Sequence, residues 1–93
     1  MTPTRWICPA CGYDQLDEAP WSNDGAPSDE ICPSCGIHFG YDDAAGGDIS
    51  ARPLIYAGWR ADWRSRGCPW FSSATPPPAN WNPDQQLKRV APP

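Results

Sequence analysis

The chain has few of the branched aliphatic residues that normally fill a protein core. Leu, Ile and Val number three, five and one among 93 residues, while six Trp, three Tyr and two Phe supply most of the apolar volume. A domain of this size buries only about 60–65% of the surface of its unfolded chain. We therefore expect one small domain that needs disulfides or a metal ion for stability. The length excludes a large enzyme with a separate substrate domain.

Long apolar runs are also missing. The sequence has no apolar run of the roughly 18 residues that a membrane helix needs. Its first residues, MTPTRWIC, contain no apolar segment of signal-peptide length. We expect a cytoplasmic protein without membrane contact, in a compartment where paired cysteines bind metal more often than they form disulfides. The odd count of five Cys also argues against a closed disulfide framework.

Positive charge is scarce in the first half of the chain. Residues 1–48 contain nine acidic residues and one Arg, whereas residues 49–93 contain six basic and two acidic residues. Four thiolates around a divalent cation would make the first half more negative still. Because such a surface repels phosphate backbones, we expect no nucleic-acid partner and expect this acidic face to attract a basic protein partner.

Two similar cysteine turns are the strongest pattern in the sequence. Cys8 and Cys11 lie in WICPACGY, and Cys32 and Cys35 lie, after a gap of 20 residues, in EICPSCGI. We call residues 8–12 and 32–36 the first and second knuckle; the Gly that ends each one supplies the positive φ of a tight turn. This spacing predicts a tetrahedral four-cysteine site that binds one zinc ion, with iron as the alternative metal. Four protein ligands leave no open position, so we expect a structural site.

Other reactive side chains give no catalytic constellation, and we expect no enzymatic activity. His38 is interpreted as a surface or half-buried strand residue, although it could be an alternative ligand. Cys68 is interpreted as a small buried apolar residue at a helix end rather than a reactive thiol. Asp42 and Asp43 are typical of a solvated turn.

One amphipathic helix is predicted over residues 50–66. Pro53 fits only a first turn, Gly67 is a natural stop, and Ile55, Trp59 and Trp63 recur at helical spacing. Asp62 and Arg66 of this helix are spaced to form an ion pair.

After the helix, Pro76, Pro77 and Pro78 predict an extended segment, and Asn82 predicts the cap of a short last helix that begins at Pro83. Large aromatic residues of the tail, Trp70 and Trp81 among them, either pack back on the domain or anchor a partner.

The predicted fold is therefore a small metal-stabilised α+β protein. It comprises a zinc ribbon of two knuckles with short antiparallel strands (residues 1–49), one amphipathic helix packed on the ribbon (50–67) and a Pro/Trp-rich tail with a short terminal helix (68–93). The expected partner is another protein. It would bind through the acidic ribbon face or through the aromatic residues Trp59, Trp63, Trp70 and Trp81.

Residues 6–43, with CPACGY, Leu16, ICPSC and YDD, resemble small bacterial cysteine-rich proteins of the CPCC type, although Ala10 replaces the third letter of their motif. The later pattern of Trp63, Gly67, WFS at 70–72 and Trp81 is similar to bacterial zinc-ribbon proteins with the same tail. This resemblance implies a non-enzymatic component of a toxin–immunity or conflict system, such as an immunity protein or an assembly subunit.

The knuckles also resemble those of rubredoxins, which are one-iron electron carriers. The gap between the knuckles is shorter here, and the helix and the tail have no counterpart there. The leading hypothesis is thus a zinc-binding protein-interaction module. A rubredoxin-like electron carrier and a nucleic-acid-binding zinc ribbon are the alternatives.

Overall fold

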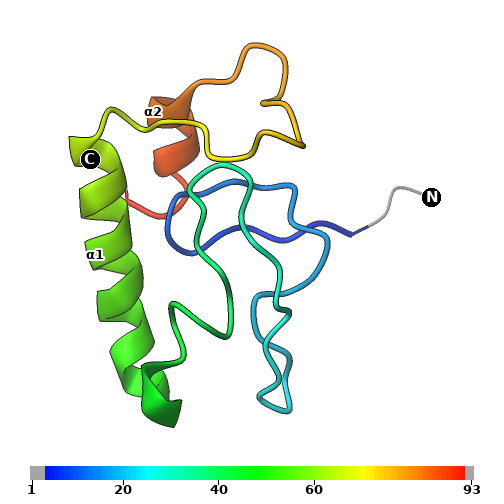
Figure 1. Cartoon of the computed structure of the whole chain (residues 1–93), viewed down its shortest axis with the longest axis vertical. Coiled ribbons are helices and arrows are strands. Elements are labelled where there is room, and N and C mark those ends of the chain that lie inside the picture. Colours follow the sequence, from blue (N-terminus) through cyan, green and yellow to red (C-terminus); the bar gives the residue numbers. More distant parts are fainter. Residues whose placement is uncertain (1–3, 92–93) are drawn as a thin grey trace.

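The structure, a computed structural model, describes residues 4–91. Its helical elements are the two short 3-10 helices η1 (Ala45–Gly47) and η2 (Ile49–Ala51), followed by α1 (Arg52–Ser65) and α2 (Pro83–Leu87). Figure 1 shows α1 along one side of the irregular cysteine-bearing loops, with α2 beside the first knuckle. Within the described residues, no helix combines the length and the apolar character needed to cross a bilayer.

The helix predicted over residues 50–66 is present as α1. Its first expected residues belong to η2, where the Asp48 side chain accepts a hydrogen bond from Ser50 N–H at 3.0 Å. Pro53 lies in the first turn of α1, as predicted, because a proline there loses no helical hydrogen bond. The predicted ion pair between Asp62 and Arg66 forms at 3.0 Å.

The amphipathic stripe of α1 faces the cysteine loops. Trp63 is fully buried, Tyr56 and Trp59 are half-buried against the core, and positions 57, 58, 61 and 62 on the opposite face are exposed. Truncation of a buried Trp to Ala typically costs about 3–5 kcal/mol. Trp63 is therefore the main apolar attachment of this helix.

The β-structure is smaller than the sequence predicted. Within residues 4–91 it consists of three isolated antiparallel bridges, Trp6 with Leu16, Trp21 with Pro27 and Ile31 with His38. Around the first knuckle, Cys8 N–H bonds to Tyr13 C=O while Trp6 pairs with Leu16, so the exiting side carries one extra residue. Such an insertion interrupts a ladder. The strands expected beside the first knuckle are therefore reduced to the single pair of Trp6 with Leu16.

The core lies around the cysteines. Among the described residues, eleven apolar ones are buried, and four of them are knuckle cysteines; the set is Cys8, Ala10, Cys11, Tyr13, Leu16, Cys32, Cys35, Ile37, Phe39, Trp63 and Leu87. A core with so few aliphatic side chains fits the expectation of a domain held by a metal ion.

The tail folds back on the rest of the domain. Trp70 packs edge-on against Tyr13 and Trp81, with ring centroids 5.7 and 5.1 Å apart. The α2 helix begins as predicted, because the Asn82 side chain accepts a hydrogen bond from Gln85 N–H and Pro83 lies in the first turn. The sequence left open whether Trp70 and Trp81 pack back on the domain or anchor a partner. In the structure, both side chains pack back on the domain.

Candidate metal centre

The two knuckles have the same backbone hydrogen bonds. Gly12 N–H donates to Cys8 C=O at 2.9 Å, and Gly36 N–H donates to Cys32 C=O at 2.8 Å. Both glycines have positive φ, at 89° and 83°, as the sequence predicted. A Cβ added to Gly36 would lie 2.5 Å from the Phe71 ring, so a larger residue would also clash with the tail. The internal duplication is thus a duplication of local structure.

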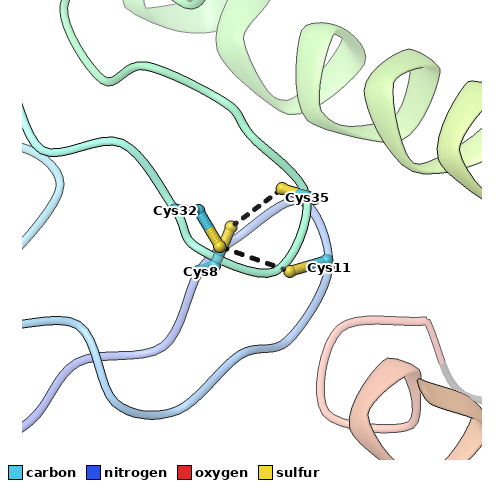
Figure 2. A group of neighbouring side chains, drawn as sticks. All are labelled: Cys8, Cys11, Cys32 and Cys35. Carbon is cyan, nitrogen blue, oxygen red and sulfur yellow. Dashed lines mark hydrogen bonds between the residues drawn. The ribbon is translucent and has the colours of Figure 1, made fainter. Parts of the chain in front are cut away.

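The knuckles bring four cysteine sulfurs together. Figure 2 shows the side chains of Cys8, Cys11, Cys32 and Cys35 pointing toward one another from two loops. All four sulfur atoms lie within 4.8 Å of one another, with Cys8 to Cys35 at 3.8 Å and Cys11 to Cys32 at 3.7 Å. A tetrahedron with metal–sulfur bonds of about 2.3 Å has sulfur–sulfur edges of about 3.8 Å. The donor set and its spacing therefore fit a tetrahedral metal ion, whereas a disulfide would need sulfurs about 2.05 Å apart.

The cysteine cluster is closed to solvent. Cys8, Cys11 and Cys32 are 0% exposed, and Cys35 is 2% exposed. Burial raises the pKa of the Cys8 thiol well above its ordinary value. A hydrogen bond with Cys32 lowers the pKa of Cys11. Four thiolates at this separation would repel one another strongly, so a cation is needed to hold them together.

The α1 helix is attached to both knuckles by hydrogen bonds to their carbonyl groups. Arg60 donates from Nε to Ala10 C=O at 2.7 Å and from a terminal nitrogen to Pro9 C=O at 2.9 Å. Trp59 donates from Nε1 to Cys35 C=O at 3.1 Å. No local sequence pattern indicates this contact of Arg60, because its acceptors are backbone carbonyls fifty or more residues away.

The tail covers the second knuckle. Phe71 N–H lies 3.2 Å from the carbonyl oxygens of Pro33 and Ser34, and Ser72 N–H donates to Pro33 C=O at 2.9 Å. These bonds satisfy backbone carbonyls at the tip of the second knuckle. The path of the chain after α1 is therefore fixed by the second knuckle.

The α2 helix covers the first knuckle. Gln86, which is 4% exposed, donates from Nε2 to Cys11 C=O at 3.2 Å and to the Ser34 hydroxyl at 2.9 Å. Arg89 donates to Gly12 C=O at 2.8 Å and forms an ion pair with Asp14 at 3.2 Å. Nothing in the local sequence of Gln86 or Arg89 indicated these contacts, because their partners lie more than fifty residues away.

His38 and Cys68 lie outside the group of four cysteines. His38 is half-buried, pairs with Ile31 in a bridge and stacks on Tyr41, in agreement with its interpretation as a half-buried residue. Cys68 is half-buried after α1, where its N–H donates to Trp63 C=O at 3.0 Å. Burial also raises the pKa of the Cys68 thiol, which disfavours the reactive thiolate.

Asp43 corrects the prediction of a solvated turn. Asp42 does stabilise that turn by accepting a hydrogen bond from His38 N–H, but Asp43 is 0% exposed. Its carboxylate accepts hydrogen bonds from Trp21 Nε1 at 2.9 Å and from Tyr56 hydroxyl at 2.6 Å, besides one from Gly40 N–H. Asp43 therefore joins the loop around Trp21 to α1, because both side chains must bury a polar hydrogen.

The four tryptophans predicted as partner contacts differ in exposure. Trp63 is fully buried and donates from Nε1 to Pro69 C=O at 2.8 Å, so its side chain is not on the surface. Trp59, Trp70 and Trp81 are half-buried against the core. The exposed large apolar side chains belong to other residues, which are Trp6, Ile7, Ile31, Tyr41, Ile49, Leu54 and Phe71.

The arrangement as a whole suits a metal ion with a structural role. Four converging sulfurs supply a complete coordination shell, and both knuckles are covered by the chain itself. No protein-family model, curated protein or solved structure matches this chain.

Proposed function

We propose that this chain is a zinc-stabilised, non-enzymatic protein-interaction module with a ribbon architecture, bound to zinc through Cys8, Cys11, Cys32 and Cys35. The observation that carries the proposal is the buried group of four sulfurs, all within 4.8 Å of one another, with two of the pairs 3.7 and 3.8 Å apart. Four protein ligands leave no coordination position for water or a substrate, so the metal would stabilise the fold rather than perform catalysis.

The covering of the knuckles favours zinc over an electron-transfer iron centre. An electron carrier needs a short path from its metal to a partner, whereas here the cysteines are at most 2% exposed. The α1 helix, the tail and α2 all bond to backbone carbonyls of the knuckles and so cover them. Rubredoxin-like electron transfer is therefore the weaker proposal, although thiolates also suit iron.

The use of the arginines disfavours a nucleic-acid ribbon. Arg60 bonds to two knuckle carbonyls, and Arg66 is paired with Asp62. Arg52 donates to Asp43 C=O and lies 3.5 Å above the Trp21 ring. Phosphate binding requires several accessible cations on one face, and these guanidinium groups already have partners.

A protein partner fits the remaining surface. The acidic first half can pair with Lys or Arg of another protein, and exposed apolar side chains such as Ile31 and Phe71 can bury area against it. We place the protein in the cytoplasm, where its thiols would stay reduced and available to zinc. An immunity protein or an assembly subunit would be a concrete form of this role.

The test is metal analysis of the chain produced in medium that contains both zinc and iron. We expect a colourless protein with a single zinc per chain, and no shift of random DNA or RNA in gels at physiological salt. Stoichiometric iron with visible charge-transfer bands would replace the proposal by electron transfer. A micromolar, steeply salt-dependent gel shift would replace it by nucleic-acid binding.

A further inference from the structure

A groove lies between the tail and the first half of the chain. Its volume is about 830 Å³, and it is open to solvent rather than enclosed. Asp14, Asp17 and Glu30 line it from the cysteine segment, and Phe71 and prolines of the 76–78 segment line it from the tail. Figure 1 shows this part of the tail (yellow to orange) as a loop that lies away from α1.

The tail wall of the groove is fixed by hydrogen bonds. The Ser72 hydroxyl accepts from Ala74 N–H at 3.1 Å and from Thr75 N–H at 2.9 Å, and Trp70 donates from Nε1 to Thr75 C=O at 2.8 Å. The start of this wall is attached to the second knuckle through Phe71 N–H. A wall that is ordered before binding lowers the entropic cost of association.

The groove also has apolar surface that the chain leaves uncovered. Phe71 is 60% exposed and Ile31 is 47% exposed, and Pro33 also lines the groove. Burial of such side chains contributes about 25 cal/mol for each Å² removed from water. An occupant with an apolar side chain would therefore gain affinity here.

The charge of the groove identifies the chemistry of the occupant. Its lining has three carboxylates and a single Arg. Arg5 forms an ion pair with Asp17, and Arg89 pairs with Asp14 from outside the lining, while Glu30 forms no ion pair within the described residues. The potential in the groove is thus negative, and it favours a cationic group.

We infer that this groove binds a short segment of a partner protein that carries Lys or Arg next to an apolar side chain. The apolar side chain would pack on Phe71 and Ile31, while the cation would approach Glu30 and the exposed Asp17. A small-molecule site would normally enclose most of its ligand, which an open groove does not do. A second copy of this chain is disfavoured because its net charge of −4 and its acidic half would repel the same surface.

This inference rests on the proposed protein-binding role. The probe is a phage-displayed library of random linear peptides, selected on the zinc-loaded full chain; the most enriched peptide is then labelled and titrated by fluorescence anisotropy. Two matched pairs of variants follow. Asp17→Lys changes an acid of the groove and Glu18→Lys changes its exposed neighbour outside it, while Ile31→Ser and Ile49→Ser remove exposed apolar side chains inside and outside the groove.

We expect enriched peptides that contain Lys or Arg beside an apolar residue, with affinity that falls as salt is added. Asp17→Lys and Ile31→Ser should each weaken binding about tenfold, whereas the control variants should leave it nearly unchanged. Metal content and circular dichroism of each variant confirm that the fold is retained.

Three outcomes would overturn the inference. The first is a selection with no enrichment, or one that enriches peptides without a basic residue. The second is a control variant, Glu18→Lys or Ile49→Ser, that lowers the affinity for the peptide as much as Asp17→Lys or Ile31→Ser does. This outcome would leave the proposed protein-binding role intact at another surface. The third is a dimer in analytical ultracentrifugation that Ile31→Ser converts to monomer, which would make a second copy the occupant.

Discussion

Removal of the metal is expected to unfold α1 as well as the cysteine loops. The perturbation is either a strong chelator or Cys32→Ser, which removes a single sulfur from the group of four. Cys68→Ser is the control, because Cys68 lies outside that group and is only half-buried.

The size of the expected loss of helix follows because α1 has few contacts other than those with the knuckles. Structural zinc contributes about 10–16 kcal/mol of apparent binding free energy in finger peptides, while whole domains are stable by only about 5–15 kcal/mol. The α1 helix has 14 residues, and Trp63 is its one buried residue. Isolated helices of about this length are marginal in water. Once the knuckles lose their shape, the carbonyl partners of Trp59 and Arg60 are lost and α1 has too few contacts to persist.

The assay combines metal content with far-ultraviolet circular dichroism. The chelated wild type and Cys32→Ser should both lose most of their helical signal and show no cooperative melting, whereas Cys68→Ser should keep the metal and melt close to the wild type. A helical signal that survives chelation would refute the coupling between the metal and α1. Release of metal by Cys68→Ser would refute the choice of the four ligands.

Three further predictions concern the residues that surround the centre. Arg60→Met should lower the free energy of unfolding by about 2–4 kcal/mol in urea titrations, since two hydrogen bonds from a charged donor are lost. Its control, Arg64→Met on the exposed side of the helix, should change the free energy of unfolding by less than about 0.5 kcal/mol. Asp43→Ala should lower the free energy of unfolding by about 3–5 kcal/mol because it leaves buried hydrogen-bond donors without an acceptor. Asp24→Ala, at an exposed position, serves as the comparison, and equal effects of the two substitutions would disprove the role of Asp43 as a buried acceptor. Burial and the adjacent Asp43 carboxylate raise the pKa of Tyr56 above its ordinary value of 10.0. Protonated Tyr56 therefore contributes to stability in full at pH values below the ordinary pKa, and this contribution is lost as the pH rises through the raised pKa. Unfolding of wild type and Tyr56→Phe across alkaline pH measures this difference, and parallel pH profiles would contradict it.

The cysteine turns were predictable because their information is local. Two residues between the cysteines and a Gly after the second one specify a tight turn in each knuckle, and the structure repeats the same hydrogen bonds at Gly12 and Gly36. The helix was predictable for a similar reason. Trp59 and Trp63 recur at the period of an α-helix, and Pro53 and Gly67 mark its ends.

The strands and Asp43 were predicted less well. Short apolar segments beside the knuckles favoured β-strands, but an extra residue between Tyr13 and Leu16 limits the first copy to a single bridge. Two adjacent Asp residues before glycines indicate a solvated turn, and only the approach of Trp21 and Tyr56 makes a buried carboxylate favourable at Asp43.

The sequence alone thus determined the four converging sulfurs, the turns that present them and the apolar face of α1, since each depends on spacing within a short stretch of chain. Only the tertiary structure decided which side chains cover the knuckles. Arg60, Gln86 and Arg89 donate to backbone carbonyls that lie fifty or more residues away. Every residue has a backbone carbonyl, so the residue type at a position does not indicate whether its carbonyl accepts such a bond. Such hydrogen-bond partners can be identified only from the folded arrangement of the chain around its cysteines.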